Sequence, residues 1–102
     1  MANMMKMMKQ AQEMQAKMQA LQAELAEREV SFSAGGEKVS VVATCDGTVK
    51  SVKIDPAVVD PDDVEMLEDL VLAAIQGAVE QGKATMAAEM GAITQGLNIP
   101  GL

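Results

Sequence analysis

Aromatic and imidazole side chains are almost absent from this chain of 102 residues, which contains one Phe and no Trp, Tyr or His. Without His, the chain lacks the side chain that most often acts as a general base or as a nitrogen ligand for metals. This argues against hydrolytic triads and zinc sites. Since Phe32 is the only ring, nucleobases would also find almost no surface on which to stack. We therefore expect no enzyme, no metal, no cofactor and no small-molecule substrate.

Cysteine and long hydrophobic runs are also scarce. Cys45 is the only cysteine, so the chain has no internal disulfide, and its composition fits a reducing, cytoplasmic compartment. A small buried hydrophobic residue on a strand is the simplest role for it. No segment approaches the roughly 18 to 20 uninterrupted apolar residues that a membrane span requires. The Met-rich start also lacks the pattern of a signal peptide. We expect a soluble protein that makes no membrane contact.

Acidic residues outnumber basic ones by 15 to 8, but the two halves of the chain differ. Residues 1–53 carry seven basic and six acidic side chains, whereas residues 54–102 carry Lys83 and nine acidic side chains. Within the first 23 residues, Glu13 is the only acid beside three lysines, Lys6, Lys9 and Lys17. The start of the chain is therefore locally cationic on an acidic protein.

A long helix is predicted over residues 1–28. From Met4 to Arg28 there is no Gly or Pro, and nearly every residue is a strong helix former. Apolar residues repeat at spacings of three and four, which is typical of a packing seam. At 1.5 Å per residue, about 24 helical residues extend over roughly 36 Å, more than the core of so small a domain could cover. Part of this helix must project or pack against another chain.

Residues 29–55 change to a period of two and predict three short antiparallel strands, with one polar and one apolar face. A turn is predicted at residues 34–36 and a type I′ hairpin turn at Asp46-Gly47, because that turn needs positive φ at both central residues. Strict alternation along the third strand places Val49 on the same face as Ser51 and Lys53.

A second helix is predicted over residues 60–91. Asp60 would cap it, Pro61 would occupy its first position, and acidic residues follow in its first turn. These acids are better explained by the helix start than by a Mg²⁺ site. Residues 92–102 are predicted to be a flexible tail. The chain is thus a single α+β domain over residues 1–102. A three-stranded sheet with two helices leaves little large apolar surface for a stable monomer, so we infer a homodimer.

Two surfaces of the first helix have more than one interpretation. Lys6, Lys9 and Lys17 lie within roughly 100° of one another around the helix, so that one side could follow a phosphate backbone. The alternative is that they are solubilising charges on an exposed face. The methionines of the same helix favour a packing seam, but flexible Met surfaces also adapt to protein partners.

The order of these patterns resembles the YbaB/EbfC family of bacterial nucleoid-associated proteins. The resemblance rests on the Met-, Lys- and Gln-rich first helix, the turn at residues 34–36, the stretch Val52–Pro56 and the segment Glu65–Ala74. It implies an α-β-β-β-α protomer and a homodimer joined mainly through its sheets. The helices of that dimer would project as two arms in a tweezer-like shape that can straddle duplex DNA.

By this resemblance, we expect largely sequence-tolerant binding of double-stranded DNA in the cytoplasmic nucleoid, with a role in nucleoid organisation and regulation of gene expression. The expected DNA-binding residues are Lys6, Lys9, Lys17 and Lys83. The expected dimer interface contains Val39, Val41, Val52, Leu67, Leu70 and Val71. As an alternative, the Met-rich helix would make the chain a protein-interaction module associated with DNA recombination or repair.

Overall fold

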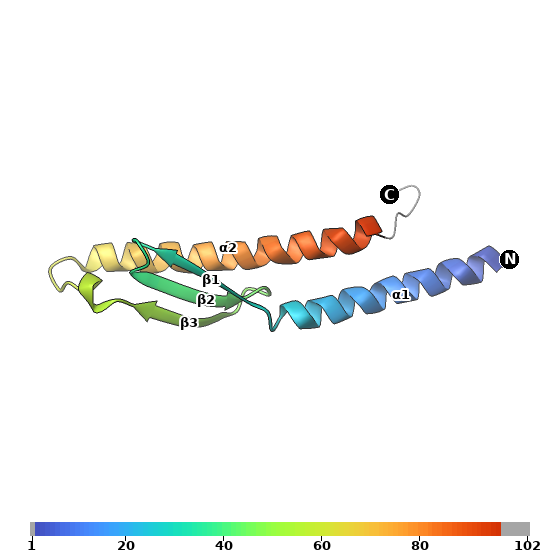
Figure 1. The fold of residues 1–102 in the computed structure, drawn as a ribbon, viewed down its shortest axis with the longest axis horizontal. Coiled ribbons are helices and arrows are strands. Elements are labelled where there is room, and N and C mark those ends of the chain that lie inside the picture. Colours follow the sequence, from blue (N-terminus) through green and yellow to red (C-terminus); the bar gives the residue numbers. More distant parts are fainter. Residues whose placement is uncertain (1, 97–102) are drawn as a thin grey trace.

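The computed structural model describes residues 2–96 and follows the predicted order of helix, three strands and helix (Figure 1). Its elements are α1 (Ala2–Leu25), β1 (Glu29–Ala34), β2 (Val39–Thr44), β3 (Val49–Ile54), the 3₁₀ helix η1 (Pro56–Val58) and α2 (Val64–Gly96). The α+β fold expected from the sequence is therefore confirmed, including the three-stranded antiparallel sheet and the two long helices.

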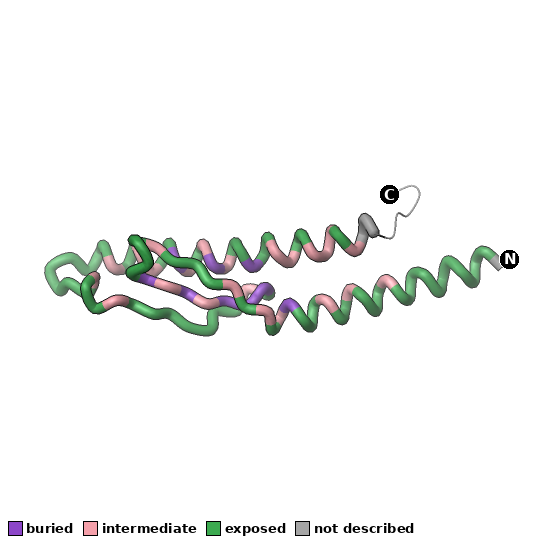
Figure 2. Tube along the Cα trace, in the orientation of Figure 1, coloured by how far each residue is buried: buried purple, intermediate pink, exposed green. Residues whose placement is uncertain are grey.

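Helix α1 is an arm that packs against the rest of the chain only toward its end (Figure 2). Leu25 is fully buried, and Met14, Met18 and Leu21 are half-buried. In the distal part of the helix, Met4, Met5, Met7 and Met8 are 62–77% exposed. Since α1 extends past the body, the chain is 74 Å long and only 22 Å and 16 Å across. The prediction that part of the first helix projects is confirmed.

The core lies between α2 and one face of the sheet. The strands pair antiparallel in the order β1-β2-β3, and α2 packs mainly against β1 and β2. Buried residues of the central strand, Val39, Val41 and Ala43, meet Ala74 and Ala78 of α2. Strand β3 lies beyond this cover at the sheet edge, and all six of its residues are exposed.

A bulge changes which side chains of β3 share a face. Ala43 pairs with Val49 but Val42 pairs with Ser51, so Lys50 is the extra residue. The bulge moves Val49 to the α2 side of the sheet, together with Val52 and Ile54. Strict alternation, which placed Val49 with Ser51 and Lys53, was therefore wrong at this point.

Both hairpin turns use left-handed backbone. Gly35 and Gly36 have φ of 64°, and Glu37 follows at 68°. In the second turn the N–H of Gly47 donates to the carbonyl of Thr44 at 3.0 Å, and Gly47 has φ of 94°. Asp46 has no positive φ, so the predicted type I′ turn is replaced by a turn that ends in one left-handed glycine, as in three-residue hairpin loops.

Helix α2 begins later and ends later than predicted. Its cap is Asp63, whose Oδ1 accepts from the N–H of Met66 at 3.2 Å, whereas Asp60 accepts from the N–H of Asp62 at 2.9 Å in the preceding turn. The helix continues past Gly91 to Gly96, since one glycine in a helix interior costs only about 1 kcal/mol. Of the predicted tail, residues 92–96 are helical and residues 97–102 lie outside the described residues.

Candidate nucleic-acid interface

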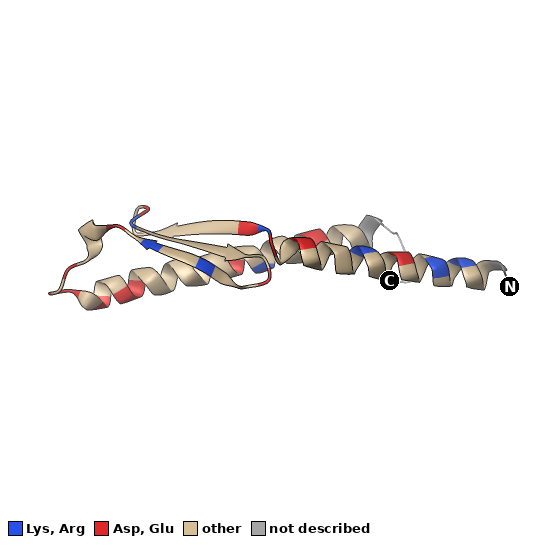
Figure 3. Ribbon diagram, turned by 90° about the horizontal axis from the view of Figure 1, so that it is seen from below, with Lys and Arg blue, Asp and Glu red and all other residues tan. Residues whose placement is uncertain are grey.

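Three lysines predicted to bind DNA lie on α1, and all are exposed: Lys6, Lys9 and Lys17. At 100° per residue they occupy one side of the helix, at an angle to the seam that faces α2. Within residues 2–96, none of the three forms an ion pair. Their ammonium groups are therefore free to meet an anionic ligand along the arm (Figure 3).

Glu13 belongs to the same side of α1 and was not predicted as part of this surface. It lies four residues from Lys9 and four from Lys17, spacing that brings side chains together on a helix. It is exposed, and in the described part of the chain it is paired with neither lysine. Its carboxylate lowers the positive potential at the middle of the lysine row. The spacing alone could have identified it.

Lys83, the fourth predicted DNA-binding residue, is exposed on α2 in a different part of the molecule. Its neighbour Gly82 is buried, and a Cβ added there would lie 2.9 Å from the carbonyl oxygen of Thr44. Lys83 is therefore placed where α2 passes the end of the sheet, at the base of the arm. Lys6 and Lys9 lie toward the free end of α1.

Arg28 joins the base of α1 to α2. Its Nη1 donates to Oε1 of Glu89 at 3.2 Å, and its Nη2 pairs with Glu24 one turn earlier on α1. The hydrogen bonds to Glu24 and Glu89 raise the pKa of the guanidinium. Arg28 lies just after α1, and through it Glu24 of α1 is connected to Glu89 of α2 at the base of the arm.

The residues predicted for the dimer interface occupy three different environments. Val39 and Val41 are fully buried beneath α2, and Leu67, Leu70 and Val71 are half-buried along α2. Only Val52 is exposed, at 42%, and its neighbours Val49 and Ile54 are 38% and 37% exposed on the same face. This row on β3, the β3 apolar row, is the apolar surface of the sheet that α2 leaves uncovered.

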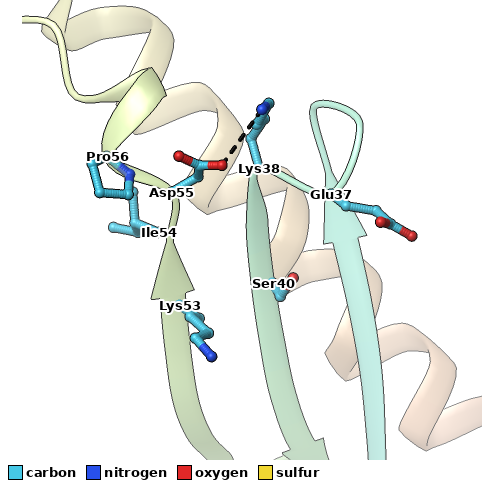
Figure 4. Close-up of a pocket in the computed structure, with 7 residues that line it drawn as sticks. All are labelled: Glu37, Lys38, Ser40, Lys53, Ile54, Asp55 and Pro56. Atoms are coloured by element: carbon cyan, nitrogen blue, oxygen red, sulfur yellow. Dashed lines mark hydrogen bonds and ion pairs between the residues drawn. The ribbon is translucent and has the colours of Figure 1, made fainter.

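On the opposite side of the sheet, a cavity of about 280 Å³ lies where β2 begins and β3 ends (Figure 4). Ser40 and Lys53, which are register partners, both line it. Lys38 Nζ pairs with Asp55 Oδ2 at 3.4 Å beside the cavity. The pKa of Asp55 is lowered, first by the hydrogen bond from the Ala57 N–H and then by Lys38. Strand pairing creates this polar site, and no local motif predicted it.

Metal ligation has no support in the part of the chain that the structure describes. Among residues 2–96, no group of three or more Cys, Asp or Glu side chains is arranged to hold a metal ion. None of the helices described is both long and apolar enough to cross a membrane.

The chain matches a known family over nearly its whole length. The family model described as the YbaB/EbfC DNA-binding family matches residues 1–97. The chain belongs to this family. The resemblance drawn from the sequence motifs is thereby confirmed, and the YbaB/EbfC family is not a family of enzymes.

Several curated proteins are similar to this YbaB/EbfC protein over nearly its whole length. A nucleoid-associated protein of Desulforamulus reducens is 52% identical over 100 residues, which cover 98% of this chain and 95% of the relative. One from Clostridium kluyveri is 50% identical, with 98% of this chain and 88% of the relative covered. One from Akkermansia muciniphila is 48% identical, with 96% and 94% covered.

A solved structure shows the same fold. The crystal structure of the uncharacterized protein HP0035 from Helicobacter pylori matches with a TM-score of 0.74 at 15% identity, covering 86% of this chain and 92% of that one. At this identity, the likeness establishes the fold of the YbaB/EbfC protein and no more.

Proposed function

We propose that this YbaB/EbfC protein binds duplex DNA as a homodimer, with little sequence preference, and thereby contributes to nucleoid organisation and the regulation of gene expression. The observation that carries the proposal is the match of residues 1–97 to a DNA-binding family. Relatives that align over nearly their full lengths are named nucleoid-associated proteins, which supports a nucleoid location.

Phosphate contact by the arms is the mode that the chemistry favours. Lys6, Lys9 and Lys17 are exposed and free of ion pairs in the described part of the chain, and lysine ammonium groups supply much of the affinity for DNA. The scarcity of rings argues against base stacking. These lysines would therefore follow the backbone of a duplex.

Sequence tolerance follows from the state of the only arginine. Arginine is the commonest reader of guanine in the major groove, where its guanidinium donates two hydrogen bonds. Arg28 is the only arginine in the chain, and it is engaged with Glu24 and Glu89. The chain therefore lacks a free copy of the commonest guanine reader, which supports weak discrimination among base pairs.

A second copy of the chain would cover the β3 apolar row. Val49, Val52 and Ile54 present adjacent apolar groups on an edge strand, a surface that natural proteins protect by pairing or packing. A homodimer centred on this row would present two arms and six arm lysines. This arrangement corresponds to the tweezer shape that the family resemblance implies.

The test is binding of labelled duplex DNA across a salt series, followed by fluorescence anisotropy. If six phosphates are neutralised per dimer, the slope of log K against log salt should be near −5, at roughly −0.9 per phosphate. The variant K6Q/K9Q/K17Q should lose most of the affinity and most of this slope.

A matched control lies on the other side of the same helix. Gln15, Gln19 and Gln22 are exposed and lie on the side of α1 away from the lysine row by helical geometry. The variant Q15E/Q19E/Q22E changes net charge by the same three units and should bind far better than the lysine variant. Equal loss in both would refute a specific role of the lysines, and no binding at low salt would refute DNA binding itself.

A second candidate is a protein-docking function for the distal part of α1, because Met4, Met5, Met7 and Met8 are highly exposed there. Such a surface could serve a partner in DNA recombination or repair. Pull-down from nuclease-treated lysate distinguishes the two functions. Partners that persist without DNA support docking, and partners that disappear on digestion support DNA binding.

A further inference from the structure

The sheet face that turns away from α2, the outer sheet face, is built mainly from serine and lysine, with Val42 as an apolar member. The strand register places Ser33, Ser40 and Lys53 in one row across the sheet, with Ser31, Val42 and Ser51 in the next. The Oγ atoms of Ser33 and Ser40 lie 3.0 Å apart. Figure 4 shows Ser40 and Lys53 on this side, with α2 behind the strands.

Lys53 supplies the positive charge of this face, and Lys50, the bulge residue of β3, lies beside it at the edge of the sheet. Both are exposed, and neither forms an ion pair within the described residues 2–96. The neighbouring Lys38 is paired with Asp55, so that these two charges offset each other. The other nearby acids are Glu29 at the start of β1, Glu37 in the β1–β2 turn beside the cavity, and Asp46 in the β2–β3 turn. The carboxylate of Asp46 is engaged by the hydroxyl of Thr44 and the N–H of Thr48.

A dimer centred on β3 would concentrate this charge. If the two β3 strands pair edge to edge with their outer faces on the same side, Lys50 and Lys53 of both protomers approach the two-fold axis. Glu29, on β1, would lie two strands away, roughly 10 Å at the usual strand spacing, which is about one Debye length at 0.1 M salt. The acids of α2 are on the far side of the sheet. Four lysines among serine hydroxyls would thus form one cationic surface per dimer.

We propose that the outer sheet face is a second DNA-binding surface, which takes the phosphate backbone of a second duplex while the arms hold the first. Lysine ammonium and serine hydroxyl groups are common phosphate ligands. This inference rests on the proposed function of the arms and adds a mechanism of compaction, because one dimer would bridge two duplexes.

The shape of the protomer supports two separate sites. The molecule is 74 Å long, and the sheet that contains Lys53 lies toward the end opposite to the free end of α1 (Figures 1 and 3). Lys6 and Lys9 lie toward that free end. A duplex between the arms would therefore leave the outer sheet face open.

A bridging assay tests the inference. A biotinylated duplex is fixed on beads, the full-length protein is added, and capture of a second, fluorescent duplex is measured at low salt. We expect K50Q/K53Q to lose at least three quarters of the captured duplex. Its affinity for a single duplex, measured by anisotropy, should stay within about twofold of wild type. The arm lysines, which supply most of this affinity, are unchanged in the variant.

The control Q76E/Q81E lowers net charge by the same two units at exposed positions of α2 and should still bridge. Bridging by K50Q/K53Q at the wild-type level overturns the inference, as does an equal loss in both variants or an equal loss of single-duplex binding. If wild type binds one duplex but never captures a second, the inference fails and the proposed function stands. If wild type binds no duplex, both fail.

Discussion

At the scale of single residues, Phe32, the only aromatic residue of the chain, packs directly against a glycine. Phe32 of β1 covers Gly77 of α2, and a Cβ added at Gly77 would lie 2.2 Å from the ring carbon Cε1 and 2.7 Å from Cγ. No real Cβ contact is this short, so alanine at this position forces the ring or the helix to move. Glycine here is required by close packing, although it weakens a helix interior.

Gly77→Ala should therefore destabilise the protein by about 1 kcal/mol, because overpacking typically costs 1–3 kcal/mol and helix propensity returns about 1 kcal/mol. Gly91→Ala on the same helix is the control. Nothing lies within 4 Å of its added Cβ, so it should stabilise by up to about 1 kcal/mol. Urea unfolding at one fixed protein concentration measures both.

The double variant F32A/G77A separates the contact from other causes. Removing the ring should make Gly77→Ala neutral or stabilising in the F32A background, as a double-mutant cycle reveals for residues in direct contact. If Gly77→Ala stabilises the wild-type protein as much as Gly91→Ala does, the packing described for Phe32 is incorrect.

At the scale of elements, the row of lysines on α1 also contains one acidic residue. Glu13 lies between Lys9 and Lys17 on one side of the helix and is exposed. A carboxylate there would approach the phosphates that the lysines attract. Two unit charges at 4 Å in water interact by about 1 kcal/mol, and less at greater distance, so the penalty per arm is modest.

Glu13→Gln should raise the affinity for duplex DNA by about threefold at low salt, since it removes this repulsion, and the gain should fade above about 0.3 M salt as screening increases. Fluorescence anisotropy across the salt series measures the effect. Glu80→Gln, at an exposed position of α2, changes net charge equally and should raise affinity less. Equal gains in the two variants would indicate that only net charge matters and that the lysine row is not the contact surface.

The elements also show what local sequence can and cannot determine. The order of helix, strands and helix was predictable, because each segment has a clear period. The exposure of Lys6, Lys9 and Lys17 was also predictable, since an apolar seam lies on a different side of α1. Glu13 could have been placed by the same geometry.

The remaining differences depend on tertiary contacts. The bulge at Lys50 arises from the pairing of β3 with β2, and no residue of β3 indicates it in isolation. Asp60 and Asp63 are equally good caps by type, so the start of α2 was ambiguous. The burial of Val39 and Val41 depends on which strands α2 covers, which the strand pattern does not specify.

At the scale of the whole molecule, the protein separates its charges along its length. The acidic excess belongs to residues 54–102, while the arm lysines lie on α1 and Lys50 and Lys53 lie on β3. A net charge of −7 per chain would repel DNA if it were spread evenly. Over distances beyond about 10 Å at 0.1 M salt, however, screening makes the local charge decisive. In the proposed dimer, two lysine rows would contact one duplex.

Val52→Asp should convert the dimer to a monomer, because it would place a carboxylate in the middle of the β3 apolar row, where a partner would bury it unpaired at a cost of several kcal/mol. Val52 is 42% exposed in the protomer, so the fold itself should survive, as circular dichroism can verify. Light scattering should show the halved mass, and the salt slope for duplex binding should fall by half, to about −2.7, since three of the six arm lysines remain. The control Ser51→Asp adds the same charge at the preceding residue, whose side chain lies on the outer sheet face, and should leave the mass unchanged. A Val52→Asp protein that remains dimeric would exclude β3 as the centre of the interface.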